Sequence, residues 1–224
     1  IYGWYTTIHG SAPRSIRPSQ IHQQRKGGND QGGCAENADA RKLKQRINLL
    51  TLPMYDVLSI GSATRDVFLV SDQFIAIKSK KFQTGMGECV SLGSKVEVDD
   101  MVLSTGGGAT NASATFSSLG LNSAIMTRIG NDASGKDVIA ELNHFGVSTH
   151  LVRVVKKGQT GFSTLLTMND GERTVLVYRG VSSSFSWSDI KQGEFKKTKW
   201  VYLTSLGGNI ALSKRIIREA HKAG

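Results

Sequence analysis

The sequence predicts an α/β protein with a mainly parallel sheet and a second, smaller β-layer at the edge of that sheet. From residue 54 onward, short apolar runs alternate with segments of helical periodicity, which is typical of strand–helix–strand units. The largely apolar run at 55–61 ends in glycine and is consistent with a buried core strand. Residues 161–180 instead form two alternating runs around Asn-Asp-Gly, which predicts a hairpin. Because a hairpin does not fit inside a parallel sheet, we assign it to the second layer.

The remaining elements follow in order along the chain. The expected strands cover 55–61, 67–70, 74–79, 88–98, 101–104, 123–130, 149–155 and 199–207. The expected helices cover 108–119, 133–146 and 211–224, and Gly146 is the expected stop of the second one. The apolar residues expected to face inward are Val138, Ile139 and Leu142 in the second helix and Leu212, Ile216 and Ile217 in the last.

Residues 1–53 differ from the rest in composition. All three prolines lie there, and residues 17–42 show neither helical nor strand periodicity. The sequence begins with Ile, and Met54 stands directly before the first predicted strand. We therefore predict that residues 1–53 are a disordered or non-native extension and that residues 54–224 are the folded part. A genuine basic tail is the alternative interpretation.

The charge and the cysteines exclude several function classes. The net charge is +10, but residues 54–224 carry 20 Lys and Arg against 15 Asp and Glu, which is an ordinary balance. Cys34 and Cys89 show no metal-binding spacing. No apolar stretch reaches the roughly 18–20 residues that span a bilayer. We predict a cytoplasmic protein that binds neither nucleic acid nor a membrane.

A glycine triplet is the first candidate for a binding site. Gly106, Gly107 and Gly108 directly precede a predicted helix, where free N–H groups can face a ligand. A tight turn would need one or two glycines, so turn formation and ligand contact both remain open. Asn111, in the first helical turn, can donate and accept hydrogen bonds to a hydroxyl. Asp66 follows the first strand at the ligand-binding edge of the sheet, where its carboxylate can bind a polyol or cap a turn.

Several segments resemble a known family. Residues 55–69, 104–120 and 124–149 resemble, in the expected order, the first signature region of the ribokinase-like (pfkB) carbohydrate kinases, and 160–186 is similar to the lid strands of that family. The resemblance covers about residues 54–224. It implies a ribokinase-like three-layer αβα fold with a small β-sheet lid. It also implies transfer of the ATP γ-phosphoryl group to a sugar hydroxymethyl group, aided by Mg²⁺.

The resemblance also assigns roles to single residues. Asp66 matches the aspartate that holds sugar hydroxyls, Gly106–Gly108 match the glycine turn that lies against the sugar, and Asn111 matches the amide of the following helix turn. Arg179, at the return from the lid, is a candidate to reach the sugar or a substrate phosphate.

Departures from the family pattern concern catalysis. No Gly-Ala-Gly-Asp segment occurs in the sequence, although that turn supplies the anion hole and the catalytic base in the family. No catalytic residue is therefore assigned, the base is expected beyond Gly224, and this chain is expected to be a fragment that is inactive alone. Gly207 stands where some members place a carboxylate.

Other functions remain open. A nucleoside kinase would need a wall for the base, and Phe82, Phe162 and Tyr178 are the candidates. A non-catalytic sugar-binding or dimerising fragment is the third interpretation. The hairpin-like residues 82–98 suggest an enlarged lid, so a homodimer through the lid is the expected assembly.

Overall fold

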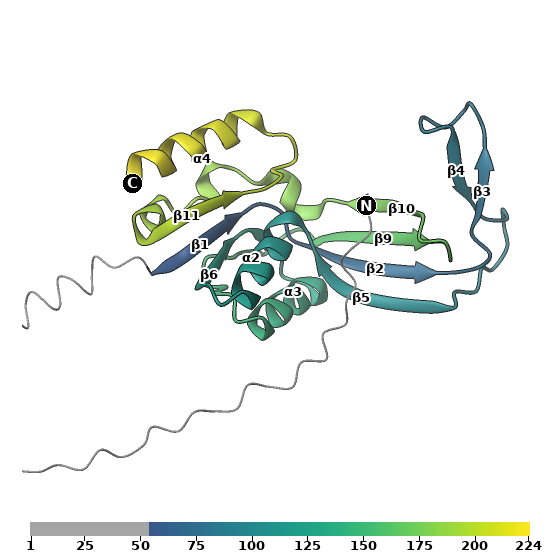
Figure 1. The fold of residues 1–224 in the computed structure, drawn as a ribbon, viewed down its shortest axis with the longest axis horizontal. Helices are drawn as coiled ribbons and strands as arrows, with labels where there is room; N and C mark the ends of the chain where they lie inside the picture. Colours follow the sequence, from purple (N-terminus) through teal and green to yellow (C-terminus); the bar gives the residue numbers. More distant parts are fainter. Residues whose placement is uncertain (1–53) are drawn as a thin grey trace, which may run out of the picture. The chain divides into compact units, whose positions relative to one another are not determined.

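The computed structural model describes residues 54–224, and the predictions made for residues 1–53 lie outside this range. The described part is α/β, with a parallel sheet between helices and a second sheet that extends from one side of it (Figure 1). We call the parallel sheet and its helices the base, and the second sheet the lid sheet.

The base has the predicted three-layer arrangement. Its sheet is parallel throughout and contains, in spatial order, β11 (Thr198–Leu203), β1 (Tyr55–Ile60) and β6 (Ser123–Met126). Helix α4 (Ile210–Ala223) covers one face, and α2 (Gly108–Ser118) and α3 (Ala133–His144) cover the other (Figure 1). Strand β1 lies in the middle and is buried on both faces, which explains its largely apolar sequence.

Two apolar cores hold these layers together. On the α4 face the buried residues include Tyr55, Leu58, Ile60, Met126, Leu151, Phe185, Leu212 and Ile216. On the other face they are Ala63, Ala109, Ile125, Ile129, Val138, Leu142 and Val147. The inward positions predicted for α3 agree with these cores, with Ile139 partly buried, and Gly146 has the positive φ (75°) of a helix stop.

The lid sheet has four strands. In spatial order they are β10 (Arg173–Tyr178), β9 (Gly161–Thr167), β2 (Thr64–Val70) and β5 (Asp100–Gly106). Strands β2 and β9 pair in parallel, whereas both outer pairs are antiparallel. The hairpin predicted at 161–180 is confirmed, with Gly171 at φ 88° in its turn. A second hairpin, β3 (Ile75–Lys78) with β4 (Met86–Cys89), extends beyond the far end of the lid sheet (Figure 1).

The register divides the lid sheet into two faces. Asp66 lies opposite Ser104 on β5 and Ser163 on β9, and Ser163 lies opposite Val177 on β10. These residues share one face, which we call the site face, because successive side chains of a strand point to opposite sides. The outer face contains Arg65 and the residues in register with it, and α3 covers part of it.

Five sequence predictions need correction. The strand expected at 199–207 ends at Leu203, and residues 204–207 form no strand. The strand expected at 123–130 is interrupted at Thr127, whose hydroxyl donates to the Gly61 carbonyl, and β7 (Arg128–Gly130) pairs separately with β8. Strand β8 (Arg153–Val155) is shorter than 149–155, because Val152 N–H closes a turn onto Thr149.

The other two corrections concern the segment after β4 and the last helix. Residues 90–98 form no strand, since Ser94 N–H turns back to Ser91 and Gly93 has φ 75°. Ile217 is 59% exposed, because α4 turns Leu212 and Ile216 toward the core, with Ala220 and Ala223 packed beside them. Three short 3₁₀ helices were not anticipated: η1 (Gly180–Ser184), η2 (Trp187–Asp189) and η3 (Gln192–Lys197).

Candidate substrate site

Gly106 brings the glycine turn and Asp66 together. It is the last residue of β5, and a side chain there would overlap the Asp66 carboxylate, which lies directly over the glycine. Asp66 accepts a hydrogen bond from the Thr64 hydroxyl at 2.9 Å and forms no ion pair within residues 54–224. A carboxylate has about four acceptor positions, so most of this one remains available to a ligand.

The other two glycines are required by close packing. Gly107, the N-cap of α2, has φ 100°, and a Cβ there would lie 2.5 Å from the Ser62 carbonyl oxygen. A Cβ on Gly108 would lie 2.8 Å from the Thr204 hydroxyl oxygen. From the sequence, a tight turn explained only one or two of these glycines. The structure explains all three by packing, because protein atoms fill the space that a side chain would need at each position. Ligand contact from the open side stays a prediction.

Asn111 lies one turn into α2. Its backbone N–H donates to the Gly107 carbonyl at 3.0 Å, which fixes the start of the helix next to the glycine turn. The residue is exposed, and no side chain within residues 54–224 hydrogen-bonds to its amide. No side chain in the described part of the chain therefore competes for this amide, and its contact with a ligand stays a prediction.

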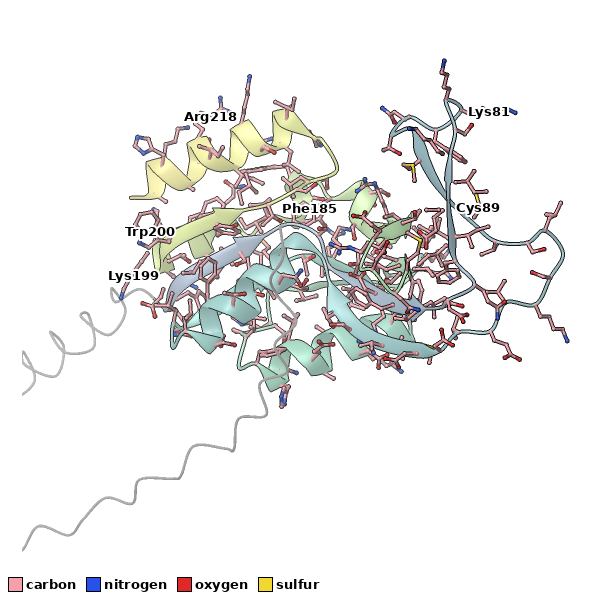
Figure 2. The ribbon with its side chains drawn as sticks, turned by 45° about the vertical axis from the view of Figure 1, so that its right-hand side comes forward. Lys81, Cys89, Phe185, Lys199, Trp200 and Arg218 are labelled. Carbon is pink, nitrogen blue, oxygen red and sulfur yellow. The ribbon has the colours of Figure 1, made fainter. Side chains whose placement is uncertain are left out.

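A small cavity adjoins the glycine turn. Its volume is about 50 Å³, and it is lined by Gly61, Ser62, Thr64, Val177, Arg179, Ser182, Ser183, Phe185, Ser205, Leu206 and Gly207. Two wall residues connect it to the glycine turn: Ser62 Oγ accepts from Gly108 N–H at 3.2 Å, and Thr64 donates to Asp66. Phe185, which lies between α4 and the lid sheet in Figure 2, forms part of the apolar floor. Of the predicted site residues only Arg179 lines this cavity, whereas Asp66, Gly106–Gly108 and Asn111 do not. The cavity is connected to Asp66 and Gly108 through the hydrogen bonds of Thr64 and Ser62.

Asp132, which the sequence analysis did not select, fastens lid strand β9 to helix α3. It caps α3 by accepting from Gly135 N–H at 2.8 Å, and it accepts from Thr160 N–H at 2.8 Å and Thr160 Oγ1 at 2.6 Å. Partial burial raises the pKa of Asp132, but these hydrogen bonds outweigh burial and hold the pKa below its ordinary value. An Asp three residues before a helical glycine was the available sequence signal.

Helix α3 also holds two further lid strands. Glu141 accepts from Arg65 of β2 at 3.1 Å and from the Thr105 hydroxyl of β5 at 2.6 Å. The Arg65 side chain is only 14% exposed, so this pair is largely shielded from solvent. Side chains of α3 and its N-cap therefore hydrogen-bond to the base-proximal ends of three of the four lid strands, β2, β5 and β9.

The segment that follows Arg179 is fixed by a buried carboxylate. Asp189 has a fully buried side chain that accepts from Arg128 at 3.2 Å and Arg153 at 2.7 Å. It also accepts from the backbone of Ser186 at 2.7 Å. These bonds hold the return from the lid against β7 and β8, and the sequence pattern gave no signal for them.

Metal ligands and membrane-spanning helices are the next features of residues 54–224. No three His, Cys, Asp or Glu side chains gather there as they would around a metal ion. We therefore assign no Mg²⁺ ligand among these residues, and Mg²⁺ binding by the whole protein stays a prediction. No helix in this part of the chain is both long and apolar enough to cross a membrane. The cytoplasmic location and the absence of nucleic-acid binding stay predictions.

Comparison with known proteins identifies a family. The family model described as "pfkB family carbohydrate kinase" matches residues 54–223. An ATP-dependent ribose-1-phosphate kinase of Halopiger xanaduensis is 32% identical over 121 residues, which is 54% of this chain and 40% of that protein.

Solved structures support the fold. The ribokinase of Giardia lamblia superposes with a TM-score of 0.62 at 17% identity, over 75% of this chain and 51% of its own. The Arabidopsis thaliana ribokinase complexed with ribose and ATP superposes with a TM-score of 0.56 at 20% identity, over 76% of this chain and 51% of that ribokinase. The chain thus spans about two-fifths of the Halopiger kinase and half of these ribokinases.

Proposed function

Because the chain belongs to the pfkB family of carbohydrate kinases, we propose that the whole protein transfers a phosphoryl group from ATP to a hydroxymethyl group of a sugar. In this proposal residues 54–224 bind and orient the sugar. The carrying observation is the contact between the Asp66 carboxylate and the glycine turn at Gly106. In this proposal the carboxylate is the hydrogen-bond acceptor for the sugar at the glycine turn, and the exposed Asn111, whose N–H donates to the Gly107 carbonyl, is the second polar group.

This arrangement suits a polyol. The carboxylate accepts hydrogen bonds from vicinal hydroxyls, the Asn111 amide both donates and accepts, and the glycines leave room for a ring face. Arg179 approaches from the neighbouring cavity. A relative that acts on ribose 1-phosphate and a neighbour that holds ribose and ATP support a substrate of about pentose size.

The chemical step needs groups that we do not assign to residues 54–224. We place the catalytic base, the anion hole, the nucleotide and Mg²⁺ outside this range, since the chain spans only part of its relatives and gathers no metal ligands in the described part. Phosphoryl transfer depends mainly on positioning and charge stabilisation, so the described residues contribute by holding the acceptor sugar.

The nucleoside kinase alternative receives less support from the structure. Phe162 and Tyr178 pair with each other in register with Arg65 on the outer face of the lid sheet, opposite the face of Asp66. Phe82 lies in the β3–β4 hairpin, against Gly87. None of these rings lines the cavity that contains Arg179.

We further propose that two copies associate through the outer face of the lid sheet. Its exposed large residues are Met101, Leu103, Leu176 and Tyr178, each at least 50% exposed. They lie on the two edge strands of the lid sheet, β5 and β10, and exposed apolar side chains are typical of interaction sites. The site face serves the sugar, which leaves the outer face for the second copy.

The test is acceptor-dependent ATP turnover by the whole protein. With Mg²⁺ and ATP, ADP release is measured for ribose, fructose, their phosphates and adenosine. We expect turnover with at least one sugar and a large loss of kcat/KM in the Asp66→Ala variant. Turnover with adenosine alone would favour the nucleoside kinase, and no turnover with any acceptor would reject both enzymes.

A further inference from the structure

The cavity beside the glycine turn has an unusual chemical lining. It contains one cation, Arg179, and five hydroxyl side chains, and its lining includes no carboxylate. Resting on the proposed function, we propose that the sugar carries an anionic group, phosphate or carboxylate, which the Arg179 guanidinium binds. The substrate class is then an acidic sugar rather than a neutral one.

Arg179 has no protein partner in the described part of the chain. Of the seven arginines in residues 54–224, Arg65, Arg128, Arg153 and Arg218 form ion pairs, and Arg215 stacks on Trp187 at 3.9 Å. Arg173 and Arg179 form neither contact, and only Arg179 lines the cavity. A guanidinium with five N–H donors and no acceptor within the protein is suited to a planar or tetrahedral anion.

Two wall hydroxyls can assist. Ser62 Oγ accepts a hydrogen bond from Gly108 N–H, so its own proton is free to donate toward the cavity. Ser205 has no hydrogen-bond partner of its side chain within residues 54–224. Gly207 has open space around its Cα, so no side chain there competes for the anion.

The spacing fits one sugar. Asp66 lies on β2, and Arg179 directly follows β10, with β9 between these strands. Neighbouring strands lie about 4.8 Å apart, which puts β2 and β10 about 10 Å apart. A pentose ring with a charged substituent spans that gap, with hydroxyls at Asp66 and the anion at Arg179.

The test is calorimetric titration of the 224-residue chain at constant ionic strength. The probes are ribose, ribose 5-phosphate, ribose 1-phosphate, the sugar acid ribonate and inorganic phosphate. Wild type is compared with Arg179→Gln, with Arg179→Lys, and with Arg173→Gln as the matched control from the other unpaired arginine.

We expect an acidic sugar to bind more tightly than ribose and Arg179→Gln to weaken it about tenfold or more, while ribose affinity and the Arg173→Gln variant stay unchanged. Tighter binding of a ribose phosphate than of ribonate would identify the anion as phosphate, and the reverse order would identify it as carboxylate. Equal affinities for ribose and the acidic sugars, or binding of inorganic phosphate as tight as that of the sugar phosphates, would overturn the inference alone. Absence of binding by every sugar would overturn the proposed function with it.

Discussion

The base and the lid sheet are held together by different forces. In the base, Leu58, Ile60, Ile125 and Met126 have no exposed surface. In the lid sheet, every residue of β10 is exposed, and Leu176 is 56% exposed. The base therefore gains its stability mainly from apolar burial. The lid sheet buries few apolar side chains, Val67 and Leu165 among them, and depends more on strand pairing and on polar side chains of α3. A layer of this kind is expected to open locally at low cost and to gain order from a ligand or a second copy.

The largest expected effect is the difference in unfolding free energy between truncating a leucine in the base and truncating one in the lid sheet. Leu58→Ala should lower the free energy of unfolding by about 2–5 kcal/mol, because it leaves a cavity in a closed core. Leu176→Ala, the matched change in the lid sheet, should cost less than about 0.5 kcal/mol. Urea unfolding of both variants measures the difference, and similar losses would show that the lid sheet is packed as tightly as the base.

The glycine turn, which connects lid strand β5 to helix α2 of the base, should lose nearly as much stability on substitution. Gly107→Ala should cost about 2 kcal/mol or more, since φ 100° is strained for alanine and the new Cβ would meet the Ser62 carbonyl oxygen. Gly193→Ala is the control, because nothing lies within 4 Å of its Cβ position. Thermal unfolding compares them, and a Gly107→Ala melting temperature equal to that of the control would refute this account of the turn.

The hydrogen bonds of Asp132 between α3 and β9 should contribute less to stability, and their contribution should depend on pH. Asp132→Asn should cost about 1 kcal/mol at pH 7, because an amide cannot accept on both sides. Since the folded pKa of Asp132 is lowered, its stabilisation is fully present above the ordinary value of 3.8 and is lost as the pH falls through the folded pKa.

Stability measured at several pH values checks this prediction. The gap between wild type and Asp132→Asn should narrow below about pH 4, while Asp72→Asn, a change at an exposed site, should show no gap. A gap that stays constant down to pH 2 would mean that the charge of Asp132 is not involved.

The smallest expected effect on stability belongs to a lysine substitution in the outer face, which should nevertheless strongly affect dimer formation. Leu176→Lys leaves the core intact and should change stability by less than about 0.5 kcal/mol. It should nevertheless convert a dimer into a monomer in analytical ultracentrifugation, because it introduces charge into the outer face. A wild-type chain that sediments as a monomer would remove the outer face as an interface.

Local patterns predicted most of the fold but not its irregular parts. The apolar run at 55–61 and the Asn-Asp-Gly turn fixed β1 and the β9–β10 hairpin, because burial and turn chemistry are local properties. The break at Thr127 depends on a hydrogen bond to Gly61, 66 residues away, and no sequence window contains both. Ile217 has the right polarity for a core position, and only the packing of α4 leaves it outside.

The candidate site shows the same division. The glycine triplet and Asp66 stood out because their residue types are unusual at those places, and the structure brings Gly106 and Asp66 into contact. Asp132 and Asp189 read as ordinary surface residues, since their partners Thr160, Arg128 and Arg153 lie in other elements. The reason for three glycines also needed the structure, because Ser62 and Thr204, which follow the ends of β1 and β11, lie close to the turn.

The most direct test of the central claim is the ribose and ribose-phosphate affinity of the chain with and without the Asp66 carboxylate. Asp66 bonds only to the hydroxyl of Thr64 among the described side chains, so Asp66→Ala should leave the melting temperature nearly unchanged. The account predicts that this variant binds the best of these sugars at least about tenfold more weakly than wild type, with Asp72→Asn unchanged. Equal affinity in Asp66→Ala and wild type would contradict it.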